Sequence, residues 1–234
     1  NIGITEAKIL GFKIVALFDQ DTLIDSDFNS KMIRNINTYR LDSDVGCFAP
    51  MVFDINRNKF LSLITVKKLR FSRKERKVLE NKIFQPDFVI TSGSYIPIKN
   101  FENIGYMDKN LFINFIDIEW CLRARYKKYK IVCFANCSIK HSIGDYSFSF
   151  FNHQFPVHSP LRLYYTFRNS IYCYRLNHIS FSWKFVDFTK NFFRFIFYIF
   201  LINDRHKYLK YICKGIYHGL IKKMGRLNEE TSKL

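Results

Sequence analysis

Two short, fully apolar runs, KIVALF at residues 13–18 and IVCFA at residues 131–135, constrain the fold of this chain most. Each has the length of a strand, and a strand without polar alternation is typical of a sheet that is covered on both faces. Other segments repeat apolar residues at the helical spacing of three and four. Strands that alternate with helices predict an α/β fold with flanking helices and a mixed, mostly parallel sheet.

The remaining elements are expected from the same periods and from glycine and proline punctuation. Further strands are expected at residues 45–53, 60–66 and 88–91, and helices at 5–11, 25–40, 97–104 and 117–129. The charged stretch 67–82 is expected to be a surface loop or an exposed helix. After His141 only helical patterns remain, so we expect a boundary near residues 150–158, between an α/β domain at 1–150 and a helical region at 151–234.

Charge is divided unevenly between the two halves of the 234-residue chain. Residues 1–120 contain 17 basic and 15 acidic side chains, whereas residues 121–234 contain 20 basic and 5 acidic ones. Apolar residues make up 48% of the chain and aromatic residues 18%, which excludes a disordered chain. The cationic second half indicates an anionic partner, either nucleic acid or a membrane surface.

The six cysteines form no CxxC pair and no zinc-finger spacing. In a chain of this size they are expected to be reduced, mostly buried thiols of a cytoplasmic protein. The longest uncharged apolar run near the end, residues 195–203, is about half of the roughly 20 residues that a membrane-spanning helix needs. We therefore expect a cytoplasmic location without a membrane span in this region.

Two aspartates, Asp19 and Asp21, follow the apolar run 13–18 directly, in the sequence FDQDT. In open α/β sheets ligands bind beyond the carboxyl ends of the strands, and two carboxylates spaced in this way reach one small volume. Such hard oxygen ligands suit Mg²⁺ or Mn²⁺. The alternative is a strand end followed by a helix cap, where aspartate is also common.

A second acidic pair, Asp117 and Glu119, opens the helix that is expected at residues 117–129. Asp117 shares a helix face with Trp120 by i, i+3 spacing and can act as a general base at the lip of a pocket. Glu119 and Arg123 form an i, i+4 pair. The alternative is a capped helix with a surface salt bridge, which contributes only a few tenths of a kcal/mol.

Four separated motifs occur together in one order: FDQDT, the stretch from ITSGSY to RARYKKYKI, IKHSIGD, and HSPLRLYYTFRN. In this set the chain resembles the inverting bacterial family-2 glycosyltransferases, in particular the rhamnosyltransferase-like group of cell-surface polysaccharide synthesis. The resemblance covers roughly residues 1–176 and implies a GT-A-like fold. Each motif alone is weak, and their common order makes the resemblance specific.

The resemblance also implies roles for individual residues. Asp19 and Asp21 match the aspartates of the metal-binding DxD motif, and Asp117 matches the catalytic aspartate. The remaining matches concern donor and acceptor binding: Ser92, Gly93, Glu119, Trp120, Arg123, His141, Gly144, Arg168 and Asn169. A lone histidine after a strand is more often structural, and the resemblance favours a place for His141 at the diphosphate or metal site.

The resemblance implies a nucleoside-diphosphate sugar donor, dTDP-L-rhamnose above all, with Mg²⁺ or Mn²⁺ as cofactor. It implies a polyprenyl-diphosphate-linked saccharide as the acceptor. The family's opening βαβ stretch, which holds the nucleotide base, has no counterpart before Asn1. We therefore expect domain 1–150 to be a glycosyltransferase catalytic domain that lacks its N-terminal nucleotide-base-binding part.

The C-terminal region is expected to contain two basic, amphipathic helices. The charges of the first recur every three or four residues at Lys184, Asp187, Lys190 and Arg194, and those of the second at Lys207, Lys210, Lys214, His218 and Lys222. Such helices lie in the interface of an anionic membrane, which predicts a peripheral protein on the inner face of the plasma membrane. The open alternative is a helical subdomain that packs its apolar face against the sheet domain.

Two further hypotheses come from other functional classes. A nucleic-acid-binding protein is compatible with basic charge interleaved with aromatic residues. The absence of RNP, zinc-finger and helix-turn-helix signatures argues against nucleic acid as a partner. The other hypothesis is an inactive, truncated paralogue that only binds membrane.

Overall fold

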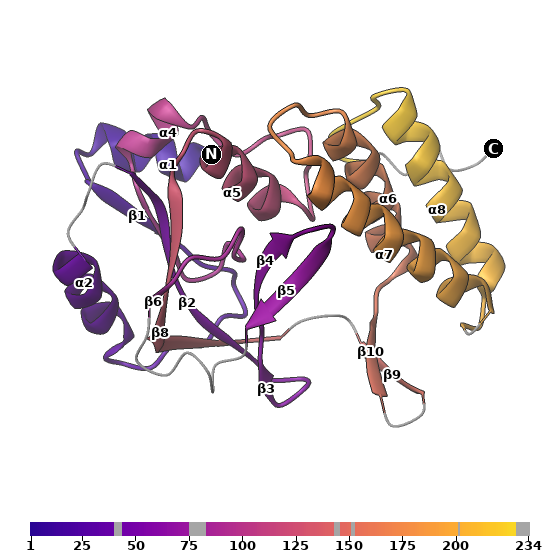
Figure 1. Ribbon diagram of the computed structural model, residues 1–234, viewed down its shortest axis with the longest axis horizontal. Helices are drawn as coiled ribbons and strands as arrows, with labels where there is room; N and C mark the ends of the chain where they lie inside the picture. Colours follow the sequence, from indigo (N-terminus) through magenta and orange to yellow (C-terminus); the bar gives the residue numbers. More distant parts are fainter. Residues whose placement is uncertain (40–43, 75–82, 143–145, 151–152, 201, 228–234) are drawn as a thin grey trace.

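A mixed sheet is the centre of the first part of the molecule (Figure 1). The computed structural model describes residues 1–39, 44–74, 83–142, 146–150, 153–200 and 202–227. The sheet has the order β1-β7-β2-β8-β6, and β3 pairs with β2. Its strands are β1 (Ile14–Leu17), β2 (Val45–Asp54), β3 (Lys59–Phe60), β6 (Ile83–Phe84), β7 (Ser94–Pro97) and β8 (Lys130–His141).

Strand directions in this sheet bring several strand ends to one edge. β2 runs parallel to β8, and β7 is antiparallel to both β1 and β2, so β1, β2 and β8 point the same way. The predicted mixed α/β architecture is confirmed. Parallel pairing is rarer than expected, because β2–β8 is the one parallel pair among the described strands. A fully apolar run indicates only that the faces of the strand are covered. It does not tell whether the neighbouring strand is parallel or antiparallel.

Helices cover both faces of the sheet. On one face, α2 (Phe28–Tyr39) buries Phe28, Met32 and Ile36 against β2 and β8, as their spacing predicts. On the other face lie α1 (Ile2–Ile9), α4 (Lys99–Asn103) and α5 (Ile116–Tyr126). A buried apolar cluster on this face contains Ile4 of α1, Phe101 of α4, and Trp120, Cys121 and Ala124 of α5. All six cysteines are free, and five of them are buried, as expected.

Three predictions about individual strands are wrong. Residues 88–91 form only an isolated bridge, and the strand begins later, at Ser94. Within 67–82, β5 (Arg70–Lys74) pairs with β4 (Leu63–Lys67), while residues 75–82 lie outside the described residues. Two strands, β9 (Tyr146–Phe150) and β10 (His153–Val157), follow His141 and form a hairpin. The sequence of β9, YSFSF, alternates aromatic and serine residues, a period-two pattern that indicates a strand although it is not a fully apolar run.

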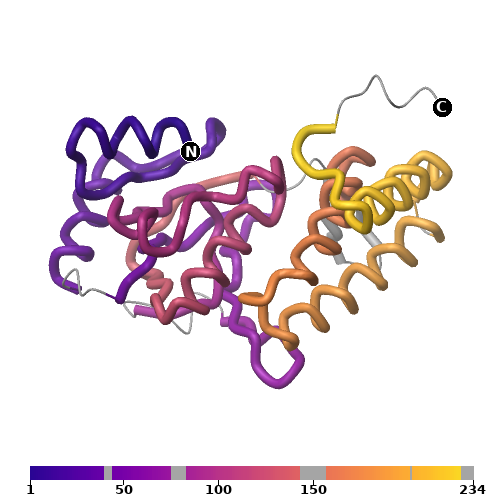
Figure 2. The backbone as a smooth tube through the Cα atoms, turned by 90° about the horizontal axis from the view of Figure 1, so that it is seen from above, coloured from indigo at the N-terminus to yellow at the C-terminus, as the bar shows by residue number. Residues whose placement is uncertain are grey.

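Three long helices, α6 (Pro160–Tyr174), α7 (Phe181–Phe200) and α8 (Arg205–Leu220), form a separate part beside the sheet, and Figure 2 shows the two parts next to each other. α8 packs closely on α6 at Gly215. A Cβ added there would lie 2.5 Å from the carbonyl oxygen of Tyr164, so only glycine permits this approach. No helix in the described parts of the chain is long and apolar enough to cross a membrane.

One member of the expected basic stripe on α8 is not on its surface. His218 is buried, and its Nδ1 lies 2.7 Å from the hydroxyl oxygen of Tyr164. Burial lowers the pKa of His218, so the neutral imidazole is favoured there. This side chain therefore helps to hold α8 on α6.

Candidate functional site

A cavity of about 600 Å³ lies between the strand ends of the sheet and the helices α6 and α7. Asp19, Asp21, Asp117 and His141 all line it. Asp19 follows β1, and His141 ends β8, which points the same way as β1. The strand ends thus bring the predicted metal ligands to this cavity, and the first turn of α5 adds the predicted base, Asp117, to the same volume.

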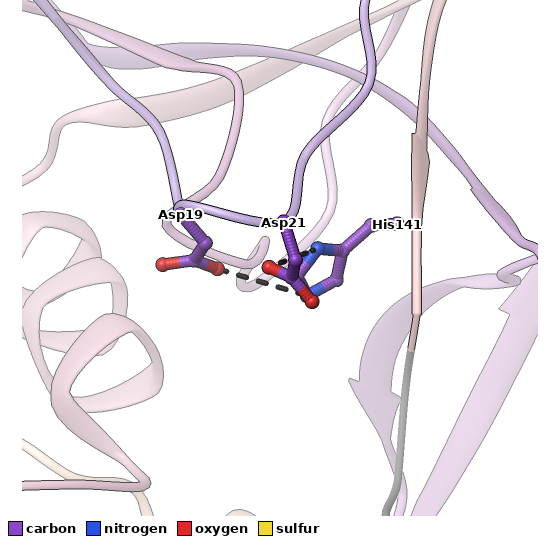
Figure 3. Close-up of side chains that lie close together, drawn as sticks. All are labelled: Asp19, Asp21 and His141. Atoms are coloured by element: carbon purple, nitrogen blue, oxygen red, sulfur yellow. Dashed lines mark ion pairs between the residues drawn. The ribbon is translucent and has the colours of Figure 1, made fainter.

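Asp19, Asp21 and His141 form a compact group of side chains (Figure 3). The Nε2 atom of His141 lies 3.7 Å from Oδ2 of Asp19, and its Nδ1 atom lies 3.3 Å from Oδ1 of Asp21. One ligand atom from each residue lies within 4.8 Å of the others. Both carboxylates are exposed, so a solute can reach them.

The donor set of this group fits a divalent cation. Two carboxylates supply the hard oxygen ligands that Mg²⁺ and Mn²⁺ prefer, and an imidazole completes a three-sided site that leaves positions for water or phosphate oxygens. Asp19, Asp21 and His141 are the residues that would hold the ion. His141 thereby joins the two aspartates that the FDQDT motif indicated.

The turn that carries the two aspartates is fixed by the segment before β7. The hydroxyl of Ser92 accepts a hydrogen bond from the backbone N–H of Asp19 at 3.3 Å and also bonds the hydroxyl of Thr22. Gly93 has a φ of +79°, and an added Cβ would lie 2.7 Å from the ring of Pro50, so a side chain does not fit there. Ser92 and Gly93 therefore shape the aspartate turn, and neither lines the cavity.

Asp117 lies in the first turn of α5 and is half-buried. Its Oδ1 accepts a hydrogen bond from the backbone N–H of Ile118 at 2.9 Å. Removal from water raises the pKa of Asp117, and this effect exceeds the opposing effect of the backbone hydrogen bonds. The result is a carboxylate of increased basicity on the cavity wall, which suits a general base.

The loop before Asp117 is held in an unusual conformation. Phe112, Asn114 and Phe115 have φ values of 58°, 62° and 66°, in the left-handed region that non-glycine residues rarely adopt. All three line the cavity. Such backbone conformations persist only where the surroundings over-determine them.

The RN pair on α6 supplies those surroundings. The side-chain amide of Asn169 donates to the carbonyls of Leu111, Ile113 and Asn114 at 2.9, 2.7 and 3.0 Å. The guanidinium of Arg168 donates to the carbonyls of Asn110 and Leu111 at 3.2 and 3.1 Å. Arg168 and Asn169 are fully buried and do not line the cavity. The two residues were expected to contact the donor or acceptor substrate. In the structure they instead hold the loop that precedes Asp117.

Glu119, Trp120 and Arg123 also lie behind the cavity wall. Arg123 makes a two-point ion pair with Glu119, at 2.9 Å for both bonds, and donates to the carbonyl of Tyr106 at 2.8 Å. Glu119 is 2% exposed, so the expected surface salt bridge is a buried one. Burial alone would raise the pKa of Glu119, but hydrogen bonds from His178 and Arg123 lower it overall. These residues set the position of α5, and with it the position of Asp117.

Several cavity residues lie within the four motifs but were given no individual role from the sequence. The most polar of them are Thr91, Asn114, His158, Ser142, Arg162 and Thr166. His158 and Arg162 flank the start of α6, and the sequence alone gave them no role. Gly144 of the H-x-x-G match lies outside the described residues. A proline-started helix with Ser159 as its cap is the one local signal near this part of the site.

Helix α7 turns its charged stripe toward the cavity. Asp187, Lys190 and Arg194 line it, whereas most phenylalanines of the same helix are exposed. Phe195 and Phe197 are the partly buried ones. The exposed apolar residues of α7 are Phe181, Phe185, Phe188, Phe192, Phe193, Ile196 and Phe200. The expected amphipathic helix is present, but its charges point inward and its aromatic face points to solvent.

The chain was compared with protein-family models, with curated proteins and with solved structures. No protein-family model matches the chain. Over 179 residues, 76% of the chain, the sequence is 30% identical to the dTDP-rhamnosyl transferase RfbF of Shigella flexneri, and the match spans 59% of that protein. The chain is also similar to a crystal structure of GalNAc-T7 with UDP, GalNAc and Mn²⁺, with a TM-score of 0.47, 12% identity, and coverage of 81% of this chain and 40% of that one.

The relationship rests on the sequence match, which extends over three quarters of the chain. That match agrees with the four ordered motifs in naming a rhamnosyl transferase as the relative. The resemblance is thus confirmed, and this chain is a family-2 rhamnosyltransferase-like protein.

Proposed function

We propose that this chain carries the catalytic site of an inverting, metal-dependent glycosyltransferase. The observation that carries the proposal is one cavity that holds both the Asp19–Asp21–His141 group and Asp117. The donor is a nucleoside-diphosphate sugar, with dTDP-L-rhamnose favoured by the rhamnosyl transferase relative. The acceptor is a lipid-linked saccharide, polyprenyl-diphosphate-linked, in the synthesis of a cell-surface polysaccharide such as O-antigen or capsule.

The chain's own residues supply the steps of a single displacement. Asp117 removes the proton of the acceptor hydroxyl as that oxygen forms a bond to C1 of the sugar. The bond from C1 to the diphosphate breaks on the opposite side, so the anomeric centre is inverted. A divalent ion at Asp19, Asp21 and His141 would stabilise the negative charge on the leaving diphosphate. Ser92 and Asn169 hold the two acidic segments in place through the hydrogen bonds described above.

A transfer assay tests this function. The complete reading frame that contains this chain is incubated with radiolabelled dTDP-rhamnose, Mn²⁺ and a lipid extract from the source cells. We expect label in the lipid fraction, loss of transfer on chelation of the metal, and inversion at C1 by NMR of the product. Absence of transfer from dTDP-rhamnose and from a panel of other nucleotide sugars would refute the proposed activity.

We also propose that the exposed aromatic face of α7 binds an anionic membrane surface, which would hold the protein on the inner face of the plasma membrane. Phe188 and Phe193 are 60% and 67% exposed in the middle of this face. Aromatic side chains on one helix face insert at the boundary between head groups and acyl chains. Exposed lysines on α8, Lys207 and Lys210, add attraction of about 1 kcal/mol each where they lie near anionic lipid.

Vesicle binding is expected to depend on this face. Replacing both Phe188 and Phe193 by asparagine should weaken co-sedimentation with phosphatidylglycerol-containing vesicles at least about tenfold, because each buried phenylalanine contributes roughly 1.5–3 kcal/mol. Phe12→Asn is the matched control, since Phe12 is 61% exposed on the sheet part.

Equal vesicle binding by the double variant and the wild type would contradict membrane docking through α7. Self-association in solution that the double variant abolishes would assign the face to a contact between copies. Strongly salt-dependent binding of DNA without vesicle binding would favour the nucleic-acid hypothesis.

A further inference from the structure

The cavity has two walls of opposite charge. On the sheet side, Asp19, Asp21 and Asp117 contribute carboxylates. On the helical side, Arg162 of α6 and Lys190 and Arg194 of α7 contribute cations. We call these three residues the basic wall. Asp187 is the one acidic residue that α6 and α7 contribute to the described lining of the cavity.

Asp187 is tied to its own neighbours. Its Oδ2 atom accepts hydrogen bonds from the hydroxyl of Tyr174 at 2.8 Å and from the amide of Asn191 at 2.9 Å. Burial raises the pKa of Asp187, against the opposing effects of the Tyr174 hydrogen bond and of the charges of Lys190 and Arg194. One carboxylate faces three basic side chains here, so it offsets only part of the charge of the basic wall.

Burial lowers the pKa of both α7 cations and the charge of Asp187 opposes this effect, but neither of them makes a short ion pair with Asp187. Among the described residues, neither Lys190 nor Arg194 has a carboxylate oxygen within 4.0 Å. Arg194 donates to the amide oxygen of Asn191, and the Lys190 ammonium lies 4.8 Å from the centre of the Phe71 ring. Removal from water lowers the pKa of Arg194, so an anion beside it would be favourable.

We propose that Arg162, Lys190 and Arg194 form a binding site for a phosphate group that is separate from the Asp19–Asp21–His141 group. This rests on the proposed function, in which both substrates carry diphosphate. Arginine suits this task because its planar guanidinium binds two phosphate oxygens at once, and lysine adds a point charge. A cavity of about 600 Å³ is large enough for a sugar and a phosphate group together.

The phosphate can belong to either substrate. The donor diphosphate has its own binding group at the metal ligands of the sheet wall. The basic wall faces that group from α6 and α7, and the outer face of α7 is the aromatic face proposed to meet lipid. This placement favours a phosphate of a lipid-linked acceptor that reaches the cavity from the α7 side.

Calorimetry with simple anions tests the site without requiring activity. In metal-free buffer the complete protein should bind inorganic pyrophosphate. Lys190→Gln and Arg194→Gln should each weaken that binding at least about tenfold, because hydrogen bonds to charged groups are strong ones. Lys184→Gln is the matched control, since Lys184 lies on the same helix and does not line the cavity.

Two further titrations identify the source of the phosphate. Farnesyl diphosphate represents the acceptor, and dTDP with Mn²⁺ represents the donor. Weakening of farnesyl diphosphate binding alone assigns the basic wall to the acceptor, and weakening of dTDP binding assigns it to the donor. Thermal unfolding checks that each variant is folded, and Lys190→Gln, at an exposed residue, keeps the test available if Arg194→Gln is unstable.

Unchanged affinity for pyrophosphate, farnesyl diphosphate and dTDP in both folded variants would overturn the proposal that the basic wall binds phosphate. This outcome is distinct from failure of the proposed function. If no sugar is transferred but the variants lose pyrophosphate binding, the phosphate site stands and the transferase proposal fails. If transfer occurs and the variants bind all three anions like the wild type, the transferase stands and the phosphate site fails.

Discussion

Replacing Asp117 by asparagine is expected to lower kcat for sugar transfer by roughly 10²- to 10⁴-fold, the usual contribution of a positioned general base. The amide cannot take up the hydroxyl proton, but it has the same size and can still accept the hydrogen bond from the N–H of Ile118. Donor binding should stay close to that of the wild type. The measurement combines kcat with the affinity for dTDP-rhamnose by calorimetry in the absence of acceptor.

Asp108→Asn is the matched control for this substitution. Asp108 is half-buried like Asp117, and its Oδ1 accepts a backbone N–H, that of Asn110, at 2.9 Å. It does not line the cavity. We expect this control to keep most of its activity. Normal turnover in Asp117→Asn would remove Asp117 from the role of base.

The pH profile gives a second readout of the same group. A general base acts in its deprotonated form, so kcat should rise with pH through the pKa of Asp117 and then level off. Because burial raises this pKa, the rise should lie above the ordinary value of 3.8. The residual activity of Asp117→Asn should lack this step.

The sequence was sufficient to predict which residues after the apolar strands contribute to the site. The apolar run that became β8 is buried, whereas β1 is an edge strand that is only partly buried. The ends of these two strands bring Asp19 and His141 to one edge of the sheet. Asp117 joins them because α5 begins at the cavity with its acidic first turn. Local patterns succeed here because strand direction alone determines which ends meet.

The sequence was not sufficient to predict the roles of polar residues whose hydrogen-bond partners lie far away along the chain. The sequence left Arg168 as either a phosphate contact or a charge on the helix surface. Its actual role as a buried donor, which Asn169 shares, depends on carbonyls more than 50 positions away, such as that of Leu111. The helical spacing of residues likewise predicts a charged face and an apolar face for α7. It does not predict which of the two is turned toward the rest of the protein. Only the packing shows that its charges face the cavity.

Replacing Asp21 by alanine is expected to weaken Mn²⁺ binding at least about 100-fold. Loss of a supporting residue around a metal ligand already costs about 10- to 100-fold in metal affinity, and loss of a ligand should cost more. Asp21 is one of three side chains in the group, and its Oδ1 atom lies 3.3 Å from Nδ1 of His141. Calorimetric titration with Mn²⁺, and with dTDP in its presence, measures the effect.

Asp25→Ala is the control for that titration, because Asp25 is an exposed aspartate four residues further along that does not line the cavity. His141→Ala should reproduce the loss of Mn²⁺ binding if the imidazole is a ligand, whereas a purely structural histidine would leave the affinity close to that of the wild type. Binding of dTDP in the absence of metal should not weaken in Asp21→Ala, because without the metal ion that carboxylate only repels the diphosphate. Unaltered Mn²⁺ affinity in Asp21→Ala would exclude this group as the metal site.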